Sequence, residues 1–297
     1  MRALYWFRND LRLQDQPGLA AAADAEELLL VYLWPRQRPW CNLQGIGAQR
    51  ERFVTESLIC LDQDLQALGQ RLMVLQGSPE LVIPDLVRDY HIDSVHCSAC
   101  VGSYETRALR ILAERLPVPV QEHAPNTLFN AAAIAQALPV LPETFSPFRR
   151  KVERALQADA TGQDPSRLPP PPAVRFDRIP PAAARPQLAL ALRGGTQAGQ
   201  RRLRQFVSDG QGIREYKATR NTLDPLQGSS TLSPWLANGC LSAREIAVAI
   251  AAHEPRDGAN ESTAWLYFEL LWREYFYWRA REDGIALFRH GGRNPQG

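Results

Sequence analysis

Five short apolar segments recur through the first half of the chain, and segments with helical periodicity lie between them. The apolar segments are ALYWF (3–7), LLLVYLW (28–34), RLMVLQG (71–77), SVHCSA (94–99) and VPVQEH (118–123). The intervening helical segments include 52–68, 79–90 and 103–116. Strands that are apolar on both faces and alternate with helices indicate a parallel sheet that is covered on both sides. Because crossovers between parallel strands are right-handed, the pattern predicts a doubly wound α/β domain over residues 1–148.

The segment after the first predicted strand, RNDLRLQDQPGL (8–19), contains no G-x-G-x-x-G motif. A standard dinucleotide fingerprint is therefore absent, and the fold class alone does not indicate a dehydrogenase. Ligands of such a sheet are expected beyond the carboxyl ends of the strands.

A proline-rich segment marks a change of architecture. Residues 164–186 hold eight prolines among 23 residues, which excludes a helix or a central strand. This composition predicts a stiff extended connector, and we assign residues 149–186 as a linker. Beyond it the strand-like segments disappear, and helical periodicity appears in 197–209, 242–253 and 261–282. We therefore expect residues 187–297 to form an all-helical domain.

Charge is distributed unevenly along the chain. Residues 1–148 carry 12 basic and 17 acidic side chains, a net charge of −5, whereas residues 149–297 carry 22 and 15, a net charge of +7. The second half is therefore the part expected to attract a polyanion. No run of about 18 apolar residues occurs, and the N-terminus carries charges where a signal peptide needs its apolar stretch. The sequence predicts a cytoplasmic protein with no membrane partner.

The cysteines favour free thiols. Five cysteines, an odd number without an export signal, argue against a disulfide framework. Cys97 and Cys100 have C-x-x-C spacing, but no second pair completes a zinc site, and the stretch is typical of the end of a buried strand. We interpret the pair as structural and predict no metal site, with redox or metal use as the alternative.

The stretch GSSTLSPWLANGCLS (228–242) is typical of a loop that leads into a short helix. Ser233 followed by Pro234 predicts an N-cap and a first-turn proline, and Gly239 predicts a C-terminal cap. The hydroxyl groups and backbone N–H groups of residues 228–231 precede that helix and outline a phosphate cradle. The alternative is an ordinary capped loop rich in serine.

The stretch WLYFELLWREYFYWR (265–279) holds eight aromatic residues among fifteen. A helix would bring Glu269, Trp272 and Arg273 to one side, and rings in the other directions predict burial nearly all round. A buried glutamate and arginine need partners. Pairing of Glu269 with Arg273 at i,i+4 would satisfy both. Alternatively the side is a cavity wall, where the arginine meets a phosphate or a polarised ring, the tryptophan stacks on a flat ligand and the glutamate bonds to a base edge.

Six long, specific segments occur in order along nearly the whole chain. They are YWFRNDLRLQDQPGL (5–19), TFSPFRRKVE (144–153), YKATRN (216–221), STLSPWLANGCLS (230–242), FELLWREYF (268–276) and LFRHGGRNPQG (287–297). Together with the proline connector, they resemble the photolyase/cryptochrome family, and most closely its cryptochrome DASH branch.

The resemblance implies an N-terminal α/β antenna domain and a C-terminal helical domain that holds FAD bent into a U. In that family, light excites the reduced flavin, which donates an electron to a cyclobutane pyrimidine dimer in DNA, and the split product returns it. DASH members resemble repair enzymes that favour single-stranded or looped DNA. The resemblance thus implies FAD as the cofactor and DNA as the partner.

The resemblance also implies roles for individual residues. Tyr216 matches the family tyrosine at the flavin, and Arg220 matches a nearby DNA-contacting arginine. Glu269 corresponds to the glutamate that touches the dimer, Trp272 to the stacking tryptophan and Arg273 to the flavin-side arginine. The residues that match the phosphate loop are Ser229, Ser230, Thr231, Leu232 and Ser233.

Two further expectations depend on the resemblance. Glu105 matches a glutamate that contacts a folate antenna, methenyltetrahydrofolate, in some members, although a glutamate in a first helical turn is also favourable to the helix dipole. The family continues beyond LFRHGGRNPQG, so we expect a truncated FAD-binding domain. A non-catalytic flavin- or partner-binding photoreceptor-like protein and an inactive remnant therefore stay open as alternatives.

Overall fold

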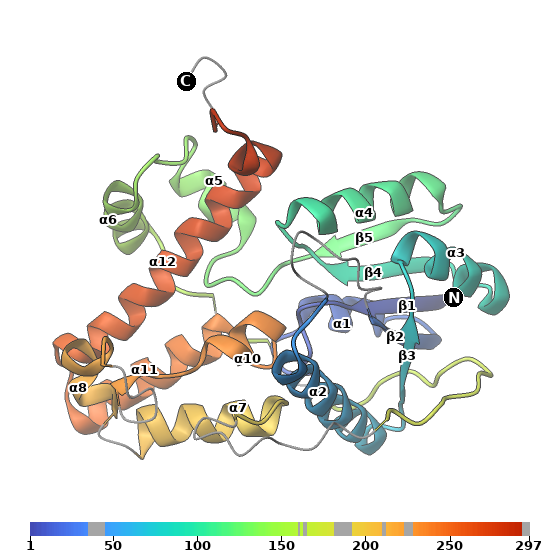
Figure 1. Ribbon diagram of the computed structural model, residues 1–297, viewed down its shortest axis with the longest axis horizontal. Coiled ribbons are helices and arrows are strands. Elements are labelled where there is room, and N and C mark those ends of the chain that lie inside the picture. The colour runs from blue at the N-terminus through green and yellow to red at the C-terminus, as the bar shows by residue number, and fades with distance from the viewer. Residues whose placement is uncertain are drawn as a thin grey trace.

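The computed structural model describes residues 1–34, 45–159, 161–162, 165–180, 192–209, 212–222 and 228–292. Five strands form one parallel sheet in the order β3-β2-β1-β4-β5. They are β1 (Arg2–Phe7), β2 (Glu27–Trp34), β3 (Leu72–Gln76), β4 (Ser94–Ser98) and β5 (Val120–His123). The chain runs outward from β1 to β3 and then crosses back to β4, which confirms the predicted doubly wound α/β class (Figure 1).

The helices of this part cover opposite faces of the sheet. They are α1 (Pro17–Ala22), α2 (Ala48–Ala67), α3 (Pro79–Tyr90) and α4 (Ser103–Arg115), whereas α5 (Ala131–Ala137) lies away from the sheet (Figure 1). Successive side chains of a strand point to opposite faces. Tyr5 of β1 accordingly belongs to the same buried cluster as Leu19 of α1 and Leu61 of α2. Its neighbour Leu4 belongs to a second cluster, with residues of α3 and α4.

The second part of the chain is helical where the structure describes it, as predicted. Its helices are α6 (Phe145–Ala155), α7 (Thr196–Leu203), the π-helix η1 (Arg204–Ser208), α8 (Gly212–Thr219), α10 (Ser233–Asn238), α11 (Ala243–Asp257), α12 (Glu261–Asp283) and the 3-10 helix η2 (Gly284–Phe288). The buried side chains of α7, α8, α10, α11 and α12 continue the cluster that begins on the α1/α2 face of the sheet. In Figure 1 these helices lie beside the sheet, with α12 as the long outer helix.

The proline-rich segment has neither helix nor strand over residues 165–180, as expected. It runs along the α/β part, where the carbonyl oxygen of Pro170 accepts a hydrogen bond from the backbone N–H of Leu28 at 2.9 Å. Residues 160, 163–164 and 181–186 of the predicted linker lie outside the described residues. The division into residues 1–148, 149–186 and 187–297 stays a prediction.

The short helix α10 departs from the predicted capping. It begins at Ser233 itself, Leu232 occupies the N-cap position, and no side chain makes a cap hydrogen bond, so the prediction of Ser233 as the N-cap is wrong. The C-terminal cap is confirmed, because Gly239 has a φ of 70°. A β-carbon at Gly239 would lie 2.2 Å from the carbonyl oxygen of Asn9. A glycine there lets α10 approach the loop after β1.

A buried ion pair joins the two parts of the chain. The Nε atom of Arg244, in the first turn of α11, donates to Oδ2 of Asp15 at 2.8 Å, and the side chains are 5% and 3% exposed. Oδ1 of Asp15 also accepts from the backbone N–H of Gly162 at 2.9 Å. Nearby, the Nη1 atom of Arg12 donates to the carbonyl oxygen of Gly239 at 3.1 Å. The loop after β1 is therefore tied to α10 and α11 by polar contacts that water does not reach.

Two predictions about the chain as a whole can be compared with the structure. Cys97 lies in β4, and burial raises the pKa of the Cys97 thiol to about 12 and that of Cys100 to about 11. Such thiols stay protonated at neutral pH, which argues against redox use.

Among the helices that the structure describes, none is both long and apolar enough to cross a membrane.

Candidate functional site

The junction of α8 and α12 brings Glu269 together with two donors. Nη1 of Arg220 and Nε1 of Trp265 each donate to Oε1 of Glu269 at 3.0 Å. The Arg220 guanidinium also lies over the Trp265 ring, 5.0 Å from its centre. The side chains of Arg220 and Glu269 are 30% and 33% exposed, so the charged pair is accessible from solvent. Of the two alternatives for this side of the helix, the pairing of Glu269 with Arg273 is not the one found, because Glu269 pairs with Arg220, the residue that follows α8.

Tyr216 lies between this pair and the serine-rich loop. Its side chain is 8% exposed and packs edge-on against Phe206, with ring centres 5.6 Å apart. Burial raises the pKa of Tyr216, and the negative charge of Glu269 adds to this effect. A side-chain hydrogen bond with Ser230 lowers it in part. The predicted residues Tyr216, Arg220, Ser230 and Glu269 are thus brought together.

Arg202 of α7 holds the serine-rich loop. Its Nη2 atom donates to the carbonyl oxygen of Ser229 at 2.7 Å, and its Nε atom donates to that of Ser230 at 2.9 Å. Arg202 was not among the predicted site residues, although the arginine pair at 201–202 within the expected helix 197–209 was a signal for it. Leu232 is 2% exposed and anchors the loop, whereas the hydroxyl residues 229–231 stay partly exposed.

Trp272 already stacks on other rings. Its ring centre lies 3.7 Å from that of Phe145 at an angle of 13°, and 5.5 Å from that of Phe276 at 25°. Phe276 is 61% exposed, so the prediction that this helix is buried nearly all round is wrong. A base that stacked on Trp272 would compete with Phe276, which is the more distant and more exposed of the two rings.

Arg273 points toward the loop that precedes α5. Its Nη1 atom donates to the carbonyl oxygen of Asn126 at 2.6 Å and lies 3.6 Å from Oε1 of Glu274. Burial lowers the pKa of Arg273. The structure therefore places Arg273 one helical turn beyond Glu269 but with different partners.

Glu274 is a buried carboxyl group that the sequence analysis did not identify. It is 0% exposed and accepts hydrogen bonds from the backbone N–H of Leu128 at 2.8 Å and from Nε1 of Trp278 at 3.2 Å. Burial raises the pKa of Glu274 to about 7, against the opposing effect of Arg273. The residue thus joins α12 to the loop at residues 127–130.

We expect Glu274 to make the stability of the protein depend on pH. The folded-state pKa of about 7 lies above the ordinary value of 4.5, so protonation stabilises the folded state and this contribution is lost as pH rises from 4.5 through 7. The loss is at most about 1.4 kcal/mol for each pH unit in that window. Urea unfolding of the protein and of Glu274→Gln at pH 5, 6 and 7 measures it. Equal slopes for both proteins would contradict the assignment.

Glu105 turns back on the start of its own helix, α4. A β-carbon added at Gly102, the N-cap residue, would lie 2.0 Å from Oε2 of Glu105. This placement fits a first-turn carboxylate that interacts with the helix N-terminus. The role of Glu105 toward a folate stays a prediction.

The carboxyl end of the sheet, where β1 and β4 adjoin, holds a buried polar cluster around Asp10. The carboxylate of Asp10 accepts hydrogen bonds from Oη of Tyr5 at 2.6 Å, Oγ of Ser98 at 2.7 Å and the backbone N–H of Arg8 at 2.7 Å. Parallel sheets commonly bind ligands at such a switch point. Here the described side chains bond to one another at that place.

Comparisons with known proteins agree with this architecture. A family model described as DNA photolyase matches residues 3–173. A cryptochrome DASH from Idiomarina loihiensis is 37% identical over 97% of this chain and 65% of its own length. The crystal structure of a Synechocystis sp. cryptochrome is 32% identical and superposes with a TM-score of 0.89 over 98% of this chain and 63% of that one.

A more distant match shows the fold alone. An archaeal photolyase from Sulfolobus tokodaii, solved with two FAD molecules, is 19% identical and has a TM-score of 0.67 over 97% of this chain and 61% of that one. The chain spans a little under two thirds of the length of these proteins. Since the family model covers more than half of the sequence, the chain belongs to the photolyase/cryptochrome family and resembles its cryptochrome DASH branch.

Proposed function

We propose that the chain acts as a light-driven, FAD-dependent DNA lyase that splits cyclobutane pyrimidine dimers by electron transfer. The observation that carries the proposal is the junction of α8 and α12. There a partly exposed carboxylate, Glu269, is held by Arg220 and Trp265 beside Tyr216 and the 229–231 loop. Relatives that match nearly the whole chain are named cryptochrome DASH, which supports the same reading.

The residues of the loop fit a phosphate-bearing cofactor in chemical terms. Residues 229–231 offer partly exposed hydroxyl groups, and Ser233 is exposed at the start of α10. Arg202 donates hydrogen bonds to the carbonyl oxygens of Ser229 and Ser230. Its positive charge therefore offsets the repulsion between these oxygens and a phosphate. FAD, when bound, supplies the light-absorbing electron donor.

Tyr216 and Arg273 would bind the flavin end of the same cofactor. Tyr216 presents a buried phenol that hydrogen-bonds with Ser230 of the loop. Arg273 uses Nη1 for Asn126, and a guanidinium has five N–H donors, which leaves capacity for a further acceptor. Glu105 is our candidate contact for a folate antenna.

DNA would bind across the exposed side of α12. In this proposal Arg220 contacts a phosphate, Glu269 bonds to the edge of the extruded pyrimidines and Trp272 stacks on them. Extruding a damaged pair costs a few kcal/mol, which stacking on an aromatic ring offsets by about 1–3 kcal/mol per base. The net charge of +7 on residues 149–297 favours a polyanion there.

A photoreceptor-like protein that binds flavin without splitting dimers is the second candidate. The stack of Trp272 on Phe145 and Phe276 favours it, because a lesion must displace a ring to stack there. An inactive remnant is the third candidate, and flavin binding separates it from the other two.

The test begins with the absorption spectrum of the purified chain after incubation with FAD. We expect bound flavin, binding of single-stranded DNA that carries a dimer, and loss of the dimer under blue light. Arg220→Gln should make the dependence of log affinity on log salt shallower by about 0.7, as expected for one lost phosphate contact on a single strand. Arg115→Gln, an exposed change on α4, is the matched control. Absence of bound flavin would overturn the proposal, and flavin without dimer loss would favour the photoreceptor-like protein.

A further inference from the structure

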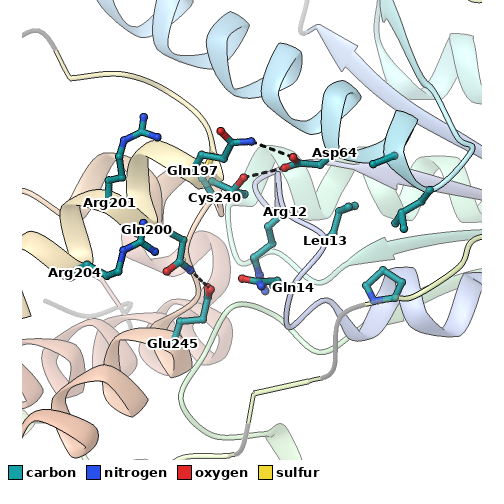
Figure 2. Close-up of a pocket in the computed structure, with 14 residues that line it drawn as sticks. Arg12, Leu13, Gln14, Asp64, Gln197, Gln200, Arg201, Arg204, Cys240 and Glu245 are labelled. Atoms are coloured by element: carbon teal, nitrogen blue, oxygen red, sulfur yellow. Dashed lines mark hydrogen bonds between the residues drawn. The ribbon is translucent and has the colours of Figure 1, made fainter. Parts of the chain in front are cut away.

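A cavity of about 580 Å³ lies between α2 of the α/β part and α7 of the helical part, with the loop after β1 beside it. Its lining includes Arg12, Asp64, Gln197, Gln200, Arg201 and Arg204 (Figure 2). None of the residues proposed above for flavin or DNA lines it. We propose that this α2–α7 cavity binds a small phosphate monoester of nucleoside monophosphate size.

Three arginines give the α2–α7 cavity its preference for an anion. Arg201 and Arg204 are exposed and lie three residues apart along α7 and η1, on the side of the cavity opposite Leu13 in Figure 2. Guanidinium groups bind phosphate oxygens through paired N–H donors. Asp64 and Glu245 are the acidic residues of the lining, so the arginines leave one positive charge in excess.

Arg12 is the buried arginine of the cavity lining. The residue is 1% exposed, and it donates from Nη1 to Gly239 and from Nη2 to the carbonyl oxygen of Asp15, at 3.1 and 2.8 Å. Its Nε atom is buried and has no hydrogen-bond partner among the described residues. Water does not reach this Nε atom, so Arg12 contributes positive charge behind the cavity wall rather than a donor to the ligand. Figure 2 shows Arg12 between the α7 side and Leu13.

The two acidic residues are already bonded to neutral donors. Asp64 accepts from Oγ1 of Thr196 at 3.1 Å and from Nε2 of Gln197 at 3.4 Å. Glu245 accepts from the backbone N–H of Ser242 at 2.6 Å and from Gln200. These contacts hold Gln197 and Gln200 in place, and each amide keeps a carbonyl oxygen that can accept from a base or sugar.

The remaining lining of the α2–α7 cavity favours a ligand that is larger than inorganic phosphate and has an apolar part. Leu13, Ala67, Leu68 and Pro165 form an apolar side against which a flat ring can lie. The volume falls within the range of about 300–1,000 Å³ that is typical of small-molecule sites. An apolar wall, fixed amides and two accessible arginines together match a ring, a sugar and a phosphate.

The test measures binding of AMP, adenosine and inorganic phosphate to the full chain by calorimetry. We expect AMP to bind at least tenfold more tightly than either adenosine or inorganic phosphate. Arg201→Gln/Arg204→Gln should weaken AMP binding at least tenfold. Both side chains are exposed, so this variant should fold as the parent does, which circular dichroism checks.

Two control variants separate this cavity from other sites. Arg115→Gln removes an exposed arginine elsewhere, and Ser230→Ala/Ser233→Ala alters the loop proposed for FAD. Both should leave AMP affinity unchanged. Loss of AMP binding in the serine variant would place the nucleotide in the flavin site and overturn the inference. Equal affinity for AMP and inorganic phosphate, unchanged affinity in the arginine variant, or no saturable binding would also overturn it.

Discussion

Replacement of Asp15 with asparagine should lower the free energy of unfolding by about 3–5 kcal/mol. Asp15 and Arg244 form the ion pair that joins the two parts of the chain, and both are almost fully enclosed. Removing one charge leaves the other buried without compensation, which is the costly way to break such a pair. Asparagine is the conservative choice because Asp15 has a φ of 49°, a region that asparagine tolerates. Urea unfolding at pH 7 measures the change.

The matched control for this prediction is Asp24→Asn. Asp24 is exposed, so its replacement should change the free energy of unfolding by no more than about 0.5 kcal/mol. If Asp15→Asn changed stability as little as Asp24→Asn, water would have to reach the pair and the joint between the two parts would not depend on it.

The largest functional effect should follow from Ser230→Ala/Ser233→Ala. Each hydrogen bond to a charged phosphate is worth about 1.5–3 kcal/mol, so the loss of two should weaken FAD binding by roughly two to four orders of magnitude. Ser233 makes no cap hydrogen bond in α10, so its replacement should cost little stability. Titration with FAD, followed by flavin fluorescence, measures the affinity.

Stability and affinity must be measured on the same preparation of this double variant. Ser146→Ala, an exposed change on α6, controls for the loss of a hydroxyl group. Parent-like affinity in a folded Ser230→Ala/Ser233→Ala protein would show that the loop does not hold the phosphates, and the alternative of an ordinary serine-rich loop would stand.

The α/β part could be predicted from local patterns. The predicted helix at 79–90 coincides with α3, and the strand predicted at 94–99 differs from β4 by one residue. Strands buried on both faces appear as short continuous apolar runs, and amphipathic helices appear as apolar residues at helical spacing, so both can be recognised in the sequence itself. The prediction of the N-cap of α10 failed because a serine followed by a proline fits two placements. Ser233 can be the N-cap residue before the helix or the first residue of the helix. Only the position of the preceding loop decides between them.

The partners of the site residues could not be predicted from spacing along one helix. Glu269 bonds to Arg220, 49 residues away, and Arg273 bonds to Asn126, 147 residues away. Intrahelical pairing at i,i+4 is worth only about 0.2–0.5 kcal/mol, so tertiary contacts readily replace it. Arg202 was missed for the same reason, since its role depends on carbonyl groups 27 and 28 residues further along.

The two buried clusters on opposite faces of the sheet differ in the conformational entropy that the chain loses when each cluster forms. The cluster under α3 and α4 draws on residues from Leu4 to Leu116 and on a few side chains of the proline-rich segment. The cluster on the α1/α2 face extends as far as Trp278, so its completion joins residues more than 200 positions apart. The entropic cost of closing a loop grows with its length, and contacts between distant residues form slowly. One side of the sheet can therefore close early from nearby segments, whereas the other stays open until the helical part has docked.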